Sequence, residues 1–289
     1  MKTRIEWTDH SLGAARMGIY GCSHTASRGC DHCWAEALAS RFEAAHGYPP
    51  GIVANGRWTG RLSTDYSKII PAFDSLPKRK GCRVFAPSSG DLLHEQVPPS
   101  FAARVIREFS LRPHLTGQIL TKRPERVSFA WNSYIAQFGS QHWPPNVWIG
   151  GSFSTQADLD RGLPDLLRVP AAVRFLSLEP LLEPVRVFPP DPPEPPGIDS
   201  DHDWAARLTG AESALLDCRY EATPIDWIII GAESGPHRRP CRLEWVRAIV
   251  EQCDAAGTAV FVKQLEIDGR LSRDPAEWPP WARRQEDPR

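Results

Sequence analysis

Short apolar runs alternate with longer amphipathic runs along this 289-residue chain, and this alternation constrains the fold more than any other feature of the sequence. The expected strands are nearly all apolar, as is typical of strands buried on both faces of a parallel sheet. They are Gly18–Tyr20, Arg83–Ala86, Gly117–Leu120, Val147–Ile149, Val173–Leu176, Trp227–Ile230 and Ala259–Val262. The expected helices are Cys33–Ala45, Tyr66–Leu76, Ser100–Leu111, Glu125–Phe138, Gln156–Leu167 and Leu243–Ala256. This pattern predicts an α/β fold, and its roughly six or seven units favour a (β/α) barrel, full or partial and TIM-like, over an open sheet.

One proline-rich stretch interrupts the alternation. The run that begins at Pro189 can form neither a helix nor a central strand, because proline lacks the backbone donor that both need. Since it lies between two strand units, we expect a loop insertion over residues 188–224, before the sixth strand, which could include a helix at Asp203–Asp217. The chain is then expected to form a single barrel domain over residues 1–267. Residues 268–289 would follow as a tail that packs on the outside.

Composition narrows the class of protein. The formal net charge of −1 gives no overall electrostatic case for binding nucleic acid, although a local basic patch remains open. Seven cysteines, an odd number without regular spacing, argue against a secreted disulfide framework. No stretch approaches the length that crosses a bilayer, and the first residues lack the apolar run of a signal peptide. We therefore expect a cytoplasmic protein with no membrane partner.

Three cysteines lie within twelve residues near the start of the chain: Cys22, Cys30 and Cys33. A structural zinc site is closed by four protein ligands. Three thiolates around an iron–sulfur cube instead hold three irons and leave the fourth open to a small molecule. Radical enzymes hold S-adenosyl-L-methionine in this way, so the trio predicts a metal site with an open position.

Polar residues follow most of the expected strands at the point where each strand ends. They include Asp91, Lys122, Ser152, Glu179, Glu233 and Lys263. In a barrel these positions converge at the carboxyl ends of the strands, where active sites lie. For any one of them a solvated loop is an equally good explanation. For the whole set a function is the better one, because a charged side chain in a barrel opening needs a partner. The small residues around Glu233, namely Gly231, Ala232, Ser234 and Gly235, would let backbone N–H groups approach a ligand, or simply form a tight turn.

Several stretches together resemble a phage-associated family of largely uncharacterised proteins whose three-Cys motif is similar to that of radical S-adenosylmethionine enzymes. They are Ile5–Asp9, Gly21–Glu36, Ser89–Glu95, Leu120–Arg126, Val173–Leu182, Asp226–Pro236 and Val262–Gln264. The sequence departs from the usual pattern in places. Seven residues separate Cys22 from Cys30, where radical enzymes most often have three. His32 replaces the usual aromatic residue before the third cysteine, and Trp34 replaces a tyrosine after it.

The resemblance implies a radical-enzyme barrel, often partial, with a [4Fe-4S] cluster at its opening. Cys22, Cys30 and Cys33 would be the metal ligands. The cofactor S-adenosyl-L-methionine would yield a 5′-deoxyadenosyl radical that abstracts a substrate hydrogen. Its binding would involve Gly231, Glu233, Ser234, Ser152 and His32. The catalytic residues that orient substrate or cofactor would be Asp91, Lys122, Glu179 and Lys263, with Arg123.

The resemblance also implies partners: an external electron donor and a three-Cys-motif partner protein. Lys122, Arg123 and Arg126 could grip a phosphate, or form a solvated helix start. Further positive charge comes from the run at residues 237–239. Tryptophans could stack a base or simply pack in the core; they are Trp7, Trp34, Trp58 and Trp148. The substrate suggested by these features is a nucleotide or a nucleic-acid base.

Two other functions remain open at this point. In the first, His24 or His32 completes a zinc site that only braces the loop, and the protein is colourless. In the second, the chain is a nuclease or glycosidase that uses Asp91, Glu179 and Glu233 for acid–base work without S-adenosylmethionine.

Overall fold

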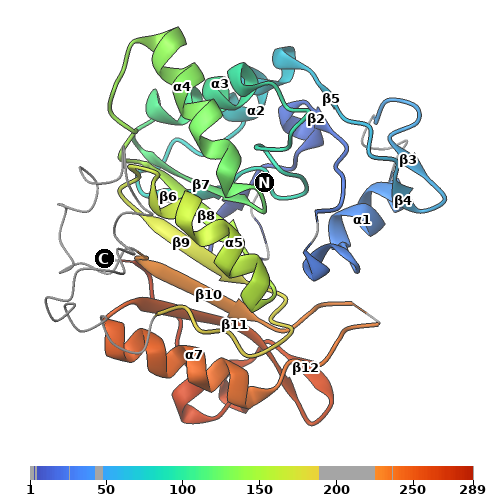
Figure 1. Ribbon diagram of the computed structural model, residues 1–289. Helices are drawn as coiled ribbons and strands as arrows, with labels where there is room; N and C mark the ends of the chain where they lie inside the picture. The colour runs from blue at the N-terminus through green and yellow to red at the C-terminus, as the bar shows by residue number, and fades with distance from the viewer. Residues whose placement is uncertain are drawn as a thin grey trace, which may run out of the picture.

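A computed structural model describes residues 3, 5–25, 27–42, 48–188, 225–235 and 237–288. Within these residues the centre of the fold is an eight-stranded, mostly parallel sheet that curls into a half-barrel (Figure 1). The strands lie side by side in the order in which they follow along the chain. They are β1 (His10–Ser11), β6 (Cys82–Phe85), β7 (Leu115–Thr121), β8 (Val147–Ser152), β9 (Arg174–Leu178), β10 (Trp227–Gly231), β11 (Ala259–Ile267) and β12 (Arg270–Ser272). Only β12 runs antiparallel to its neighbour, so the expected α/β class is confirmed.

The expected strands from Arg83 onward are confirmed as β6 to β11. The expected first strand does form, but its expected place in the large sheet is wrong. Residues Ile19–Tyr20 form β2, which pairs with β5 (Ser63–Thr64) in a small antiparallel sheet outside the half-barrel. The edge of the large sheet is β1, which pairs in parallel with β6. Gly18, just before β2, has a φ of +84°, so the chain turns there.

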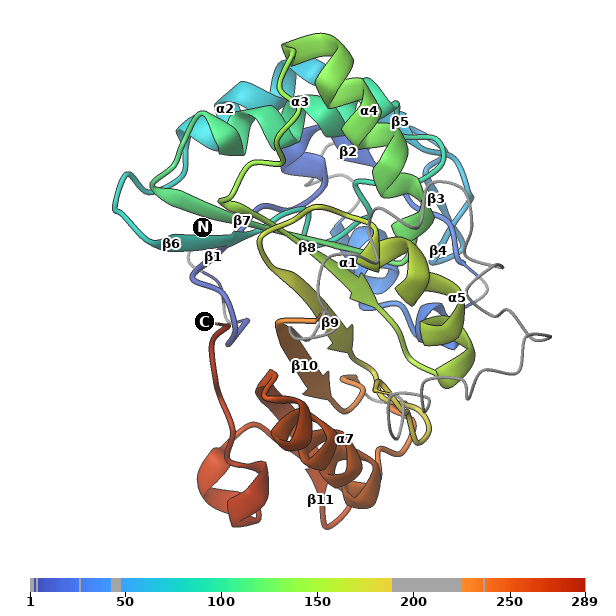
Figure 2. The same cartoon turned by 60° about the vertical axis from the view of Figure 1, so that its left-hand side comes forward.

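Helices cover one face of the sheet (Figures 1 and 2). They are α2 (Ile69–Asp74), α3 (Pro99–Ser110), α4 (Val127–Phe138), α5 (Gln156–Leu167) and α7 (Leu243–Ala256). The last two have the expected bounds. Alternate strand residues, such as Ile228 and Ile230 of β10, face these helices in the main core. The remaining helix, α1 (Trp34–Phe42), follows the cysteines and lies at one end of the strands.

The opposite, inner face of the sheet carries a separate aromatic cluster. Trp7, from the segment before β1, packs here with its ring centroid 4.8 Å from Phe85 and 6.0 Å from Trp227. Phe175 and Phe261 complete the buried rings. Phe175, Trp227 and Phe261 come from the first three residues of β9, β10 and β11, whereas Phe85 is the last residue of β6. Apolar groups therefore fill this part of the inner face. The inner-face positions at the carboxyl ends are polar.

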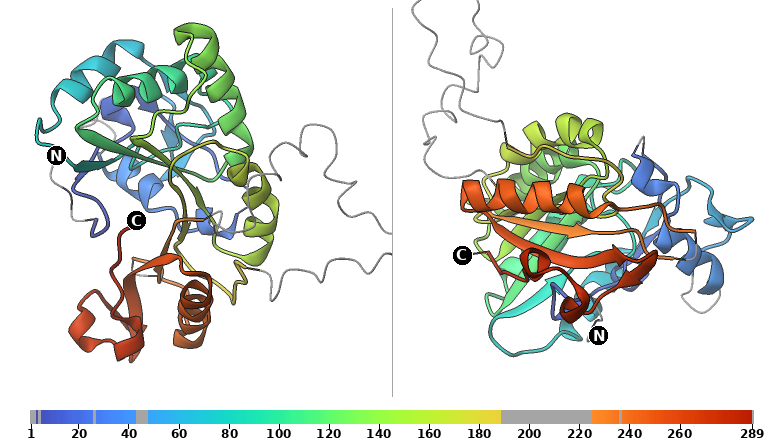
Figure 3. Two further views of the ribbon diagram at one scale, coloured as in Figure 1. Left: turned by 90° about the vertical axis from the view of Figure 1, so that its left-hand side faces the viewer. Right: turned by 90° about the horizontal axis from the view of Figure 1, so that it is seen from below.

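The cysteines belong to the long connection between β1 and β6. This connection also contains α1, α2, β5 and a hairpin of β3 (Val53–Ala54) and β4 (Arg57–Trp58). Viewed along the direction in Figure 3 (right), the arrowheads of β10 and β11 point toward α1 and this hairpin. The connection therefore brings the cysteines to the carboxyl ends of the strands.

The end of the chain takes part in the core. The segment after Ile267 adds β12 to the sheet, and Trp278 is only 1% exposed in the main core. Residues 268–289 thus do more than pack on the outside as expected. The structure does not describe residues 189–224, so the insertion expected over 188–224 lies outside the described residues from 189 onward. The helix expected at 203–217 lies outside them too. None of the described helices combines the length and apolarity that a membrane crossing requires.

Candidate functional site

The three cysteines of the predicted motif lie near one another in the structure. Burial raises the pKa of Cys22 to about 12, and the negative charges of Asp91, Cys33 and Cys30 act in the same direction. Burial also raises the pKa of Cys33, although backbone N–H groups at the start of α1 donate to its sulfur and oppose this. The loop of residues 21–33, called the cysteine loop below, therefore holds three thiols close enough for their charges to interact.

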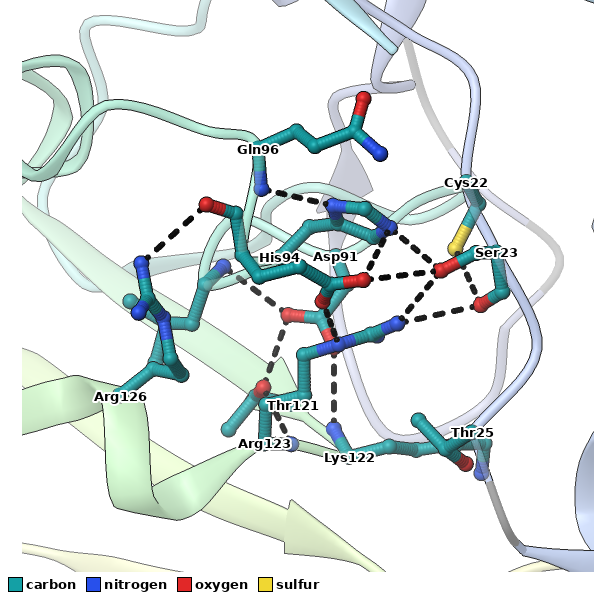
Figure 4. A network of polar contacts seen from close by, with 12 residues as sticks. Cys22, Ser23, Thr25, Asp91, His94, Gln96, Thr121, Lys122, Arg123 and Arg126 are labelled. Carbon is teal, nitrogen blue, oxygen red and sulfur yellow. Dashed lines mark hydrogen bonds and ion pairs between the residues drawn. The ribbon is translucent and has the colours of Figure 1, made fainter. Parts of the chain in front are cut away.

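The first anchor of the cysteine loop comes from the ends of β6 and β7 (Figure 4). Arg123, buried after β7, forms ion pairs with Asp91 and Glu95. Its Nη2 also donates to the backbone oxygen of Ser23 at 3.2 Å, directly after Cys22. Asp91 accepts further hydrogen bonds from Thr121 and from backbone N–H groups. Asp91 therefore organises the two strand ends and presents Arg123 to the loop.

The second anchor comes from the end of β8. The Ser27 hydroxyl donates to Asp158 Oδ2 at 2.7 Å, and both residues are buried. Asp158 occupies the first turn of α5, where the side chain of the N-cap residue Thr155 accepts its backbone N–H. Beside it, Gly29 packs so closely that a Cβ there would lie 2.3 Å from Ser154 Oγ. A side chain at position 29 would push the loop away from β8.

The third anchor comes from the end of β10. Arg239 forms an ion pair with the buried carboxylate of Glu233 and donates to it through Nε and its backbone N–H. Arg239 also donates to the backbone oxygen of Arg28 at 2.8 Å and pairs with Asp31. His32 Nδ1 lies 3.1 Å from Glu233 Oε2. Burial raises the pKa of Glu233, but the hydrogen bonds and charge of Arg239 outweigh it and hold the pKa below its usual value.

A row of polar side chains continues across the inner face beneath the cysteine loop. Lys122 Nζ donates to Ser152 Oγ at 2.7 Å. A Cβ at Gly29 would lie 3.4 Å from the same Nζ, so Lys122 reaches the loop. Farther along the sheet, Lys263 forms a half-buried ion pair with Glu179. These groups lie between β7 and β11 at the carboxyl ends.

The structure thus brings together most of the residues singled out from the sequence, but in unequal roles. Asp91, Glu233 and His32 hold the loop, whereas Lys122, Ser152, Glu179 and Lys263 lie on the inner face. Gly231 lies against Glu179, because a Cβ there would be 3.3 Å from that carboxylate. Ser234 is half-buried after Glu233.

The arginines considered for a phosphate grip have partners within the protein. The guanidinium of Arg123 contacts Asp91, Glu95 and Ser23, and that of Arg239 contacts Glu233, Asp31 and Arg28. In this structure both arginines therefore hold the cysteine loop.

The tryptophans divide between the two expectations. Trp7 and Trp148 pack in the inner-face aromatic cluster, and Trp58 packs in a small cluster with Ala39 and Ile52. Trp34, beside Cys33, is 51% exposed. Of the four, only Trp34 has a largely open ring.

Sequence reasoning missed Ser23, Ser27, His94 and Asp158 as residues that hold the loop. Thr155 followed three positions later by Asp158 is the spacing of a helix-capping pair, which could have marked this turn. No comparable local signal pointed to the two serines, since their partners are far away in sequence.

The histidines near the cysteines are already engaged by carboxylates. His24 Nε2 lies 3.1 Å from Glu36 Oε1, and His32 contacts Glu233. Among the residues that the structure describes, no three His, Cys, Asp or Glu side chains lie where they could hold a metal ion together. A closed four-ligand zinc site would therefore need these side chains to rearrange.

Comparison with known proteins gives a family without a described activity. A family model with the description "protein of unknown function (DUF5131)" matches residues 2–273. No curated protein and no solved structure matches the chain.

Proposed function

Because the chain belongs to the DUF5131 family, whose function is unknown, we propose its activity from the site itself: a radical S-adenosylmethionine enzyme. Cys22, Cys30 and Cys33 would hold a [4Fe-4S] cluster. The observation that supports this best is the cysteine loop, which carries the three cysteines and is fixed to the ends of β6, β7, β8 and β10. A loop fixed by three anchors to four strands of one sheet keeps a geometry that the loop alone would not keep.

The donor set fits such a cluster. Thiolates are its usual protein ligands, and a cube spreads them over separate irons, so the sulfurs need not converge on one point. Burial raises the pKa of Cys33, and the backbone N–H groups of Ala35 and Glu36, which donate to its sulfur, act against this and would favour a thiolate bound to metal. Both nearby histidines have carboxylate partners. This leaves three protein ligands and an open fourth position.

Within this proposal the protein binds and orients. When bound, the cluster and S-adenosylmethionine supply an electron and a 5′-deoxyadenosyl radical. The inner-face groups Lys122, Ser152, Glu179 and Lys263 would orient cofactor and substrate beneath the loop. Glu233 and His32 would act through the loop, since Arg239 already occupies the carboxylate. The half-barrel would be a partial (β/α) barrel of the TIM type, open on one side.

The substrate would be a nucleotide or a nucleic-acid base. In the described part of the chain no carboxylate pairs with Lys122, whose Nζ has the uncharged Ser152 as hydrogen-bond partner. A half-buried ammonium of this kind favours an anionic ligand. The exposed ring of Trp34 offers a stacking surface beside Cys33. An external electron donor and a three-Cys-motif partner protein would complete the system.

The test is anaerobic reconstitution with iron and sulfide, followed by reduction in the presence of S-adenosylmethionine. We expect about four irons per chain, a brown protein absorbing near ~400 nm, and release of 5′-deoxyadenosine. The variants Cys22→Ser, Cys30→Ser and Cys33→Ser should each lose the iron. Cys82→Ala, a matched change in the main core, should keep it. A fully loaded cluster that releases no 5′-deoxyadenosine would overturn the proposal.

The alternatives have weaker support. Glu179 and Glu233 are engaged by Lys263 and Arg239. The pKa of Glu233 lies below its usual value, and a carboxyl group with a lowered pKa is a poor general acid. A colourless protein with one zinc per chain would favour the zinc alternative. Cleavage of a nucleic acid or glycoside without reductant would favour the hydrolase.

A further inference from the structure

His94 is a buried polar residue beside the cysteine loop that the proposed function leaves without a role. Its side chain is 0% exposed. It follows Asp91 in the connection after β6, and its ring points toward Ser23 (Figure 4). The distance from His94 Nε2 to Ser23 Oγ is 2.7 Å.

The hydrogen bonds fix which nitrogen of His94 carries the proton. The backbone N–H of Gln96 donates to Nδ1 at 3.1 Å, so Nδ1 is an acceptor. A neutral imidazole with Nδ1 as acceptor has its proton on Nε2. Nε2 therefore donates to the Ser23 hydroxyl.

Ser23 in turn uses its whole hydrogen-bonding capacity. Its Oγ accepts from His94 and from Arg123 Nη2, at 3.1 Å, and donates to Glu95 Oε1 at 3.2 Å. A hydroxyl has one proton and two lone pairs, and all are occupied. The side chain of Ser23 is held from three directions by elements of the sheet.

Cys22 is the direct neighbour of this clamped residue. Its Sγ lies 3.4 Å from the backbone oxygen of Ser23, to which Arg123 also donates. Cys30 and Cys33 follow on the far side of the loop, where Ser27 and Arg239 form the other anchors. The position of Cys22 relative to the other two thiols therefore depends on Ser23.

We propose that His94 is a positioning residue that, through Ser23, holds Cys22 in place relative to Cys30 and Cys33. The placement of Cys22 stands on the contacts above. Its consequence for the cluster rests on the proposed function. Residues that orient metal ligands commonly influence occupancy and electronic properties in this way.

Two substitutions at His94 separate its two hydrogen bonds. The amide N–H₂ of Gln reaches about as far as Nε2, so His94→Gln can keep the bond to Ser23. Asn ends near the position of Nδ1, so His94→Asn can keep the bond to Gln96 but not to Ser23. Ser23→Ala removes the clamped hydroxyl and leaves the buried His94 side chain unchanged. His142→Asn, at an exposed histidine, is the matched control.

The first readout needs no cluster. In anaerobic apoprotein, alkylation of Cys22 by iodoacetamide is followed by peptide mass spectrometry, with folding checked by circular dichroism. We expect His94→Asn and Ser23→Ala to react at least about tenfold faster at Cys22, as a loss of about 1.4 kcal/mol in local stability implies. His94→Gln and His142→Asn should react like the wild type. Equal rates for folded Ser23→Ala and wild type, or for His94→Asn and His94→Gln, would overturn the placement.

The second readout is the reconstituted protein. We expect His94→Asn to lose most of its iron, or to shift the midpoint potential of what remains, and His94→Gln to retain both. If wild type takes up no cluster while the alkylation rates differ as expected, the proposed function fails and the placement stands. If cluster content and potential are the same in all variants, the proposed consequence for the cluster fails.

Discussion

The Ser27 hydroxyl donates a 2.7 Å hydrogen bond to Asp158, which joins the cysteine loop to the first turn of α5. The two residues are 131 positions apart in the sequence. Asp158 also accepts from the backbone N–H of Ser154 and pairs with Arg161. Burial raises the pKa of this carboxyl group, but the hydrogen bonds from Ser27 and Arg161 lower it by more. The net pKa therefore lies below the usual value. Asp158 is therefore an ionised, buried joint between loop and sheet.

Replacing Asp158 by Asn should loosen this joint. The amide keeps the size of the side chain but loses the charge and one acceptor, so we expect a loss of roughly 1–3 kcal/mol in the free energy of unfolding. Urea denaturation at pH 7 measures this. Arg161→Ala is the control: its side chain is 55% exposed, and we expect a change of less than about 1 kcal/mol. Equal losses of unfolding free energy for the two variants would contradict the role assigned to the Ser27–Asp158 hydrogen bond.

The close approach at Gly29 gives a second prediction. Gly29→Ala places a Cβ 2.3 Å from Ser154 Oγ, which is fully buried, and should cost roughly 1–3 kcal/mol of stability. Adding Ser154→Ala removes the clashing oxygen and should restore much of the loss. Gly13→Ala, whose nearest contact would be 3.4 Å from Ser89 Oγ, should be tolerated. Thermal and urea unfolding of the wild type, the two single variants and the double variant measure these differences in stability. A Gly29→Ala variant as stable as Gly13→Ala would show that the loop does not rest on β8.

The Glu233 anchor should make stability depend on pH in acid. The pKa of Glu233 in the folded protein lies below the ordinary value of 4.5 for a glutamate. A lowered pKa gives stability that is fully present above the unfolded value and disappears as the pH falls through the folded value. The difference in unfolding free energy between wild type and Glu233→Gln should therefore be largest at pH 6–7 and shrink steadily below about pH 4.5. Urea denaturation across this range measures it. A difference that is constant with pH would mean that the charge of Glu233 contributes nothing.

The Glu179–Lys263 pair should show energetic coupling. Its side chains are 17% and 16% exposed, so removal of one partner leaves a poorly solvated charge. We expect Glu179→Gln and Lys263→Met each to destabilise the protein, and the double variant to lose less than the sum by about 1 kcal/mol. A double-mutant cycle in urea gives this number. Strict additivity would show that the two charges do not interact.

Much of the sheet could be predicted from the sequence because its strands are apolar runs of four or more residues. The helices Gln156–Leu167 and Leu243–Ala256 were predictable to the residue, since Thr155 caps one and Gly257 ends the other. The edge strand β1 was not, because two residues carry no periodicity and His10 is not apolar. The sequence pattern instead predicted Gly18–Tyr20 as the first strand of the large sheet.

The residues of the candidate site likewise fall into those that a local sequence pattern indicates and those that it does not. That Lys122 and Glu179 follow strands is visible in the sequence, since each stands where an apolar run ends. Lys263 also stands where an apolar run ends, but β11 continues past it to Ile267. The sequence did not show which acidic residues would form ion pairs within the protein. Asp91 and Glu233 each meet an arginine whose place depends on the folded chain, and Arg239 reaches Arg28 across 211 positions. Such long-range pairs leave no local pattern.

The contact between His32 and Glu233 has a consequence for biosynthesis, because 201 positions separate them. Translation proceeds at roughly 5–20 residues per second, so about 10–40 seconds pass between the synthesis of the two residues. During that interval the thiols of the nascent chain have neither Asp158 nor Glu233 and Arg239 in final position around them. The three thiols therefore reach their final surroundings only after residue 239 has been synthesised, and under the proposed function the complete site would hold its cluster only from that point on.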